Sequence, residues 1–357
     1  MEKKRYANID LLKTIAILMV IALHSQLFRL DFMQYNNISS YVQYFFRIIC
    51  EGVAIFILVN GFLLINKKEF DMKKHLLKIL KIFILLILWS IILTTVIKLI
   101  YQEPLKISEI LKNIFVTDIN NKYTGVLWFL QSLIVLYLIY PVLKILHDKD
   151  QKVYDYLFIV LLIFTMGTNL LSLISELVNT RIKCNAINLG ISYMSKFQIL
   201  YNRNFLIFFM LGGYLFENKE KFEEGKIRKK WIAIGLASWI IAFIFAVSIS
   251  KLQNKTYIQN FSYGSIFMPF ILIGIFAATY NYKSKEKWYN KIIETISKNS
   301  LGIYLIHIII VRIINSLYAG QLSLPLRICK VIIVFIVSLM ITLLIRKIPK
   351  VKKLVEL

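Results

Sequence analysis

The chain has 357 residues, of which 58% are hydrophobic, and its formal net charge is +24. Soluble domains average about 45–50% apolar residues, so this composition excludes an ordinary soluble domain. The three cysteines are too few for a disulfide framework. The sequence also has no closely spaced histidines and no CxxC pair, the patterns that indicate a metal site.

The apolar residues occur in runs of about 20, which is the length that crosses a bilayer as an α-helix. The sequence therefore predicts an all-α, polytopic membrane helix bundle of about ten transmembrane helices. We expect a single domain over residues 1–357. The predicted spans are 8–28, 41–65, 79–100, 125–146, 153–175, 201–217, 231–250, 262–281, 300–318 and 326–345.

Basic residues are concentrated on one side of the predicted membrane. Most of the 44 Lys and Arg residues fall in segments that share a side with the N-terminus. Because basic segments stay in the cytoplasm, we expect both termini to be cytoplasmic in a multi-pass protein of the cell membrane. The charge then needs no nucleic-acid partner. The long segments 102–124 and 176–202 are expected outside, over the outer mouth, and His75 and His147 in solvated cytoplasmic loops.

The first span carries an acid, a base and an imidazole, at Asp10, Lys13 and His24. Eleven residues at about 100° each bring Lys13 and His24 to the same face, about 16 Å apart along the helix. Polar side chains are costly in lipid, so this stripe is expected to face protein or water. Structural roles remain open for each residue: a hydrogen bond between helices for His24, snorkelling to the headgroups for Lys13, and pairing with Lys13 or capping for Asp10.

Three further polar residues lie within predicted spans. Glu51 is expected inside the second span, where it orients His24 or bonds another helix. Tyr304 and His307 are one turn apart in the ninth span. They are expected either to form hydrogen bonds between helices or to contact a substrate.

Five sequence elements follow one another along the chain. They are Asp10…Lys13…His24, Phe56–Phe62 with Asn60, Trp128–Pro141, Phe208–Tyr214 and Ser297–His307. In these elements and their order, the chain resembles the acyltransferase-3 family of integral membrane acyltransferases over essentially its whole length. Two positions depart from the family's pattern, since Lys13 stands where the family has arginine and Asn60 where it has serine.

The resemblance implies transfer of an acyl group, usually acetyl, from a cytoplasmic acyl-CoA to a hydroxyl of an extracytoplasmic acceptor. Cell-surface polysaccharides and their lipid-linked precursors are typical acceptors. Acetyl-CoA or another acyl-CoA is the expected co-substrate, without a metal. The expected catalytic residues are His24 as general base and Glu51, and the expected residues for the co-substrate are Lys13, Lys74, Lys78, Asn60 and Trp128. A glycan-lipid transporter or flippase, or a polysaccharide polymerase, remains the alternative.

Overall fold

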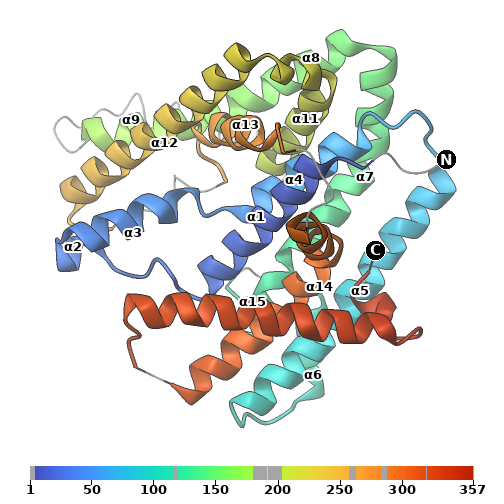
Figure 1. Ribbon diagram of the computed structural model, residues 1–357, viewed down its shortest axis with the longest axis vertical. Coiled ribbons are helices and arrows are strands. Elements are labelled where there is room, and N and C mark those ends of the chain that lie inside the picture. The colour runs from blue at the N-terminus through green and yellow to red at the C-terminus, as the bar shows by residue number, and fades with distance from the viewer. Residues whose placement is uncertain are drawn as a thin grey trace. The chain divides into compact units, whose positions relative to one another are not determined.

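A computed structural model describes residues 5–115, 120–179, 191, 203–256, 263–282, 288–318 and 320–356. The regular secondary structure of these residues is helical, without strands (Figure 1). Within the described ranges, eight helical segments are long and apolar enough to cross a membrane, and two shorter apolar helices cover Asn204–Glu217 and Met268–Thr279. Together they correspond in order to the predicted spans, so the predicted polytopic helix bundle is confirmed.

The spans are built from the following helices: α1 (Ala7–His24), α3 (Ile38–Ile49), α4 (Gly52–Leu64), α5 (Met72–Ile100), α7 (Trp128–Lys149), α8 (Gln151–Leu162), α9 (Thr168–Asn179), α11 (Arg203–Glu217), α12 (Gly225–Gln253), α13 (Met268–Thr279), α14 (Trp288–Leu317) and α15 (Leu324–Lys347). Side chains and proline set several of the ends. Asn37 and Ser40 form a capping box at the start of α3, Asp71 caps α5, and a proline lies in the first turn of α15.

Two spans are not continuous α-helices. The second is interrupted at Cys50 and Glu51, so α3 ends at Ile49 and α4 begins at Gly52. The sequence predicted Glu51 inside a helix, but the residue lies at a break between two helices. The fifth span contains a π turn at Ile163–Gly167 between α8 and α9. Such a turn accommodates an extra residue and changes the helix face that follows.

Part of the predicted outer segment 102–124 is helical. α6 (Ile107–Phe115) packs against α5. Most of the other predicted outer segment, 176–202, lies outside the described residues.

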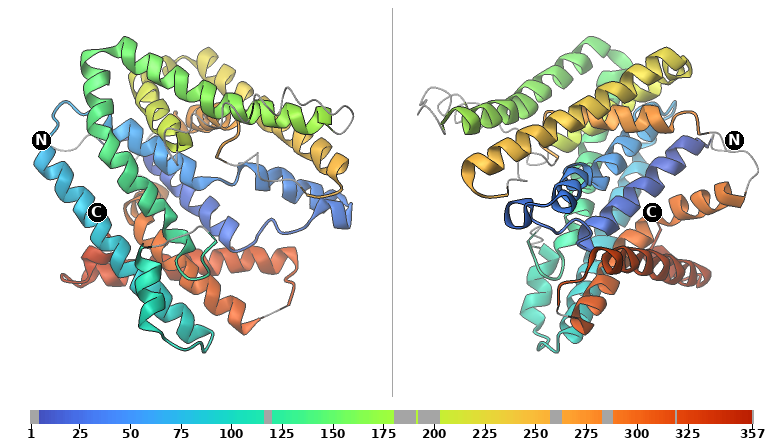
Figure 2. Two further views of the ribbon diagram at one scale, coloured as in Figure 1. Left: turned by 180° about the vertical axis from the view of Figure 1, so that it is seen from behind. Right: turned by 60° about the vertical axis from the view of Figure 1, so that its left-hand side comes forward.

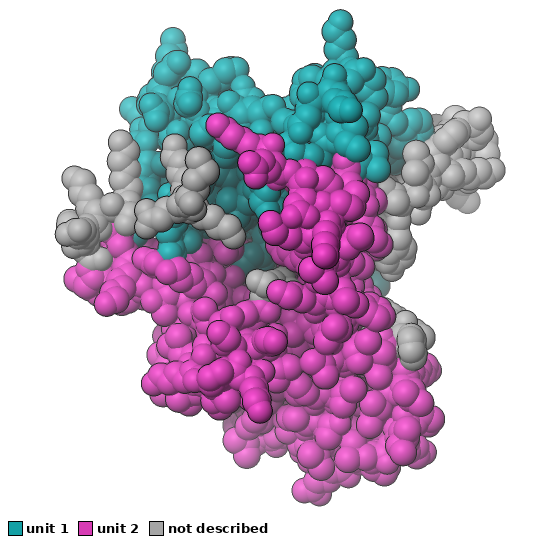
Figure 3. Space-filling model, turned by 90° about the vertical axis from the view of Figure 1, so that its right-hand side faces the viewer, with its two compact units in different colours: residues 1–12, 28–67, 142–283 teal, residues 13–27, 68–141, 284–357 magenta. Residues whose placement is uncertain are grey.

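The chain divides into two compact units, which Figure 3 draws in different colours. Unit 1 contains Met1–Leu12, Phe28–Lys67 and Val142–Lys283, and unit 2 contains Lys13–Leu27, Lys68–Pro141 and Ser284–Leu357. In unit 1, α4 packs on α11 and α12 lies along α13 (Figure 2). Buried side chains of α2 (Phe32–Tyr35), α3, α9 and α12 form a hydrophobic core cluster in this unit.

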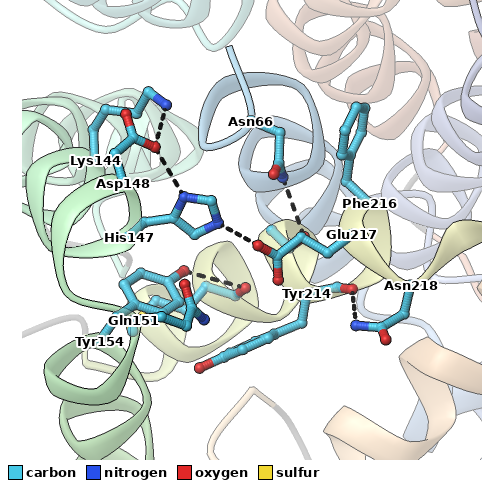
Figure 4. A network of polar contacts seen from close by, with 12 residues as sticks. Asn66, Lys144, His147, Asp148, Gln151, Tyr154, Tyr214, Phe216, Glu217 and Asn218 are labelled. Atoms are coloured by element: carbon cyan, nitrogen blue, oxygen red, sulfur yellow. Dashed lines mark hydrogen bonds and ion pairs between the residues drawn. The ribbon is translucent and has the colours of Figure 1, made fainter. Parts of the chain in front are cut away.

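A polar network in unit 1 joins the ends of α7 and α11 (Figure 4). The imidazole of His147 lies 3.1 Å from Asp148 through Nδ1 and 2.7 Å from Glu217 through Nε2. The ammonium of the buried Lys144 lies 2.6 Å from the same Asp148 carboxylate. The side chain of His147 is only 10% exposed, so the prediction of a solvated loop residue is wrong.

In unit 2, α14 packs against α15, α5 and the short turn η1 (Gly125–Leu127). Gly302 of α14 allows a close approach to α15, because an added Cβ would lie 2.3 Å from the Thr342 side chain. Trp89 of α5 donates its indole N–H to the carbonyl of Leu354 at 2.8 Å, which fixes the segment after α15.

The contact of α4 with α11 depends on two glycines. A Cβ on Gly61 would lie 1.8 Å from the carbonyl oxygen of Phe209, and one on Gly212 would lie 2.0 Å from that of Leu58. Backbone atoms cannot rotate away as a side chain can, so any side chain here would push the helices apart.

Gly61→Ala is therefore expected to lower the free energy of unfolding by about 1–3 kcal/mol or more. The unfolding temperature of the purified protein in detergent measures this effect. Gly225→Ala is the matched control, since the nearest atom to its Cβ is 3.9 Å away. Equal unfolding temperatures for the two variants would contradict the close helix contact.

Candidate functional site

The polar stripe of α1 lies along α14 in unit 2. The Lys13 ammonium donates to the carbonyl of Ser297 at 3.4 Å, and the Thr14 hydroxyl donates to that of Ile293 at 3.4 Å. At the other end, the rings of His24 and His307 have centroids 5.1 Å apart. Both helices thus run in the same direction, and the intervals from Lys13 to His24 and from Ser297 to His307 each cover about 15–16 Å.

His307 is fully buried, with 0% of its surface exposed. Its Nδ1 is hydrogen-bonded to the carbonyl of Tyr304, which can only accept, so Nδ1 carries the proton. In a neutral imidazole this leaves Nε2 as an acceptor. Nε2 of His307 has no hydrogen-bond partner among the residues that the structure describes. One end of the stripe therefore holds two adjacent imidazoles, one of them with an acceptor nitrogen still available.

Tyr304 fixes the position of this part of α14. Its hydroxyl donates to the carbonyl of Val126 in η1, and its ring meets that of Phe129 edge-to-face at 5.2 Å. Trp128, the first residue of α7, follows η1 directly. Tyr304 thus connects α14 to the turn that precedes α7. A hydrogen bond between helices was one of the two roles that the sequence suggested for this residue.

The basic residues Lys74 and Lys78 lie one turn apart in the first turns of α5. The Lys74 side chain is 85% exposed and lies 3.1 Å from Asp71, whereas the Lys78 ammonium lies 5.0 Å from the centre of the Tyr137 ring. The backbone N–H of Lys74 bonds the Asp71 carboxylate, which holds the pKa of Asp71 below its usual value.

His75 also belongs to α5. Its Nε2 is 2.7 Å from the carbonyl of Tyr137. The expectation that His75 lies in a solvated loop is therefore wrong, because it joins α5 to α7 within unit 2.

Three predicted site residues belong to unit 1. Glu51 is 5% exposed, lies 3.8 Å from Arg47 and accepts a hydrogen bond from Tyr263. Asn60 donates its amide to the carbonyl of Phe56 on its own helix at 2.8 Å. The carboxylate of Asp10 lies 2.6 Å from Arg5.

These contacts give each of the three residues a partner in unit 1. The orientation of His24 by Glu51 stays a prediction. Across the described ranges, no group of three or more His, Cys, Asp or Glu residues is arranged to hold a metal ion.

Comparison with known proteins adds one finding. A family model described as an acyltransferase domain matches residues 6–347, nearly the whole chain. The chain belongs to the acyltransferase-3 family. No curated protein and no solved structure matches it. The family and the eight long apolar helices together identify a multi-pass membrane acyltransferase.

Sequence reasoning about this acyltransferase-3 chain missed two buried basic residues of unit 2. Arg327 and Lys330 lie in the first two turns of α15, and each is 5% exposed. Their three-residue spacing in the sequence indicated a shared helix face. They continue the buried face of α15 that also contains Val334, Ser338 and Thr342.

Tyr304→Phe is expected to lower the free energy of unfolding by about 1–3 kcal/mol, because the buried carbonyl of Val126 loses its donor. Thermal unfolding of the purified protein measures the loss. Tyr318→Phe provides the comparison, since Tyr318 is 52% exposed. An unchanged unfolding temperature for Tyr304→Phe would show that the hydroxyl does not hold α14 to η1.

Proposed function

We propose that this acyltransferase transfers an acyl group, most simply acetyl, from a cytoplasmic acyl-CoA to a hydroxyl of an extracytoplasmic acceptor. The acceptor class is a cell-surface polysaccharide or its precursor. The observation that carries the proposal is the polar face shared by α1 and α14, with a lysine at one end and two imidazoles at the other. Its length of about 16 Å is of the order of a pantetheine arm.

In this proposal the phosphates of acyl-CoA bind at the inner end of unit 2. The ammonium groups of Lys74 and Lys78 are placed on one turn of α5, and Lys13 begins the polar face. Ammonium groups bind phosphate through charge-assisted hydrogen bonds. The thioester then lies toward His24, at the end of the arm.

His24 acts as the general base. Its neutral imidazole takes the proton of the acceptor hydroxyl while the oxygen attacks the thioester carbonyl carbon. The carbon–sulfur bond breaks, the CoA thiolate leaves, and the proton on His24 passes to the thiolate or to solvent. A route through an acyl-histidine intermediate has the same overall balance. The acceptor nitrogen of His307 beside His24 favours a protonated His24 in the transition state.

His24→Ala is expected to reduce acyl transfer from radiolabelled acetyl-CoA by about 10²–10⁴-fold, because the reaction loses its base. Membranes that contain equal amounts of each variant serve for the measurement. Leu18→Ala, an exposed position on the same helix, is the control and is expected to keep wild-type transfer. Wild-type transfer by His24→Ala would remove the general-base role. Glycan-lipid flux through vesicles without any acyl transfer would favour the transporter alternative.

Lys13→Ala is expected to weaken CoA binding by about 10-fold or more, since a charge-assisted hydrogen bond contributes about 1.5–3 kcal/mol. Lys13→Arg keeps the charge and is expected to bind CoA with nearly wild-type affinity. Titration of the purified variants with acetyl-CoA measures the difference. If Lys13→Ala binds like the wild type, Lys13 only anchors α1 at the interface.

A further inference from the structure

Ser25, the residue after His24, carries a buried hydroxyl that the proposed reaction does not use. Its side chain is 1% exposed, and its Oγ has no hydrogen-bond partner among the residues that the structure describes. Its backbone N–H bonds the carbonyl of Ile21 at 2.8 Å, so the helical geometry of α1 continues through Ser25. The direction of this side chain therefore follows from the rest of the helix.

Ser25 lies on the face of α1 that meets α14. It follows Thr14 by eleven residues, which at about 100° each return the helix to within about 20° of the same direction. Thr14 donates to the carbonyl of Ile293 on α14. Thr14 and Ser25 are thus related in the same way as Lys13 and His24, and both pairs face α14. The buried hydroxyl therefore belongs to the same end of this face as the imidazole pair.

His307 on α14 presents a complementary group. Its Nδ1 carries the proton that the carbonyl of Tyr304 accepts, so its Nε2 can accept a hydrogen bond but cannot donate one. Within the described ranges this buried nitrogen has no partner. Any group that pairs with it must bring a polar hydrogen. A carbonyl or a carboxylate has none, whereas a hydroxyl can donate to His307 and accept from Ser25.

Another unpartnered hydroxyl comes from the segment before η1. Thr124 is 0% exposed, and its Oγ1 lacks a partner in the part of the chain that the structure describes. Two residues further on, the carbonyl of Val126 accepts the hydroxyl of Tyr304. The ring of Tyr304 lies 5.6 Å from that of His307, centre to centre. Unpaired polar groups from three separate segments are therefore connected to the imidazole pair.

These groups indicate the chemistry of a ligand. A buried hydroxyl or imidazole nitrogen without a partner costs free energy, because it lost its hydrogen bonds to water when the chain folded. Ser25 and Thr124 can each donate and accept one hydrogen bond or more, and His307 can accept one. None of the three groups carries a charge in this arrangement. A neutral molecule with several hydroxyl groups supplies all the missing partners, and a sugar ring has this chemistry.

We infer that Ser25 and His307 bind a second hydroxyl of the acceptor, next to the hydroxyl that His24 deprotonates, and that Thr124 contacts the same sugar ring. The inference deepens the proposed function and rests on it, since it makes the acceptor a sugar with hydroxyls on neighbouring carbons. The second hydroxyl donates to Nε2 of His307 and accepts from Ser25. The two imidazoles, 5.1 Å apart centre to centre, then take one hydroxyl each.

This role is compatible with the effect of His307 on the transition state. Because Nδ1–H is held by the carbonyl of Tyr304, the negative end of the imidazole dipole lies at Nε2. The dipole acts on a protonated His24 through space and needs no direct hydrogen bond between the rings. The same nitrogen can therefore hold a hydroxyl and favour the charge on His24.

The first test separates acceptor binding from a structural role. Ser25→Ala removes a hydroxyl that has no partner among the described residues, so the free protein loses no hydrogen bond. Its unfolding temperature in detergent, without acyl-CoA, is expected to equal or exceed that of the wild type. Acyl transfer to the endogenous acceptor in membranes is expected to fall about 10-fold, the effect of one lost hydrogen bond, while the affinity for acetyl-CoA stays unchanged.

Ser238→Ala is the matched control, because it makes the same substitution at a buried serine of α12 in unit 1. It is expected to keep wild-type transfer. A lower unfolding temperature for Ser25→Ala would show that the hydroxyl is paired within the protein or by a structural water, and would overturn the site. Wild-type transfer by Ser25→Ala would overturn it as well.

The second test addresses the substrate class by competition. Membranes of the wild type, Ser25→Ala and Ser238→Ala transfer acetyl to the endogenous acceptor in the presence of cis-cyclohexane-1,2-diol or cyclohexanol at equal concentrations. The diol is expected to inhibit the wild type and Ser238→Ala more strongly than cyclohexanol does, and to lose this advantage in Ser25→Ala. Equal inhibition of the wild type by both alcohols, including none by either, would overturn the site for a second hydroxyl. So would an advantage that persists in Ser25→Ala.

If Ser25→Ala does not fold, Thr124→Val replaces it, since valine keeps the shape of threonine without the hydroxyl. Thr124→Val is expected to lower transfer at a wild-type unfolding temperature, and Thr124→Ser to restore transfer. Wild-type transfer by Thr124→Val would overturn the inference. The proposed base is tested separately: loss of transfer in Ser25→Ala but not in His24→Ala removes the base and leaves the hydroxyl site, and the reverse result removes only the site.

Discussion

The structure of unit 2 depends on the low polarity of the bilayer, in which each polar group must find a partner inside the protein. α1 meets this requirement against α14. Lys13 and Thr14 donate to backbone carbonyls of α14, and His24 lies beside the fully buried His307. Because these contacts occur at matching intervals along both helices, the two polar faces fix the direction and the register of the helix pair.

Much of the fold follows from the sequence, because a run of about 20 apolar residues is the length that crosses a bilayer as a helix. The helical spacing of Lys13 and His24 likewise predicts a common face. The interruptions within the spans, in contrast, were not predicted from the sequence. At the break, Glu51 contacts Arg47 and Tyr263, and the second of these lies more than two hundred residues away along the chain. No local pattern encodes such a contact.

The sequence predicted only part of the site, again because contacts between distant residues leave no local pattern. The predicted elements at α1 and at Ser297–His307 supply residues that meet in unit 2. The predictions for His75 and His147 were wrong, because the partners of these histidines lie on other helices. Arg327 and Lys330 were missed for another reason. The positive-inside rule counts each basic residue near a span as solvated, so a count of charges cannot reveal that two of them are buried.

The pairing of α1 with α14 also has a consequence for biosynthesis. The chain is made from its N-terminus, and Lys13 is separated by 284 positions from Ser297, the residue to which it donates. The first helix therefore enters the membrane long before its partner exists. Until α14 is inserted, the charge on α1 has to be held by water, headgroups or the insertion machinery, so assembly of this face is one of the late steps in the maturation of the protein.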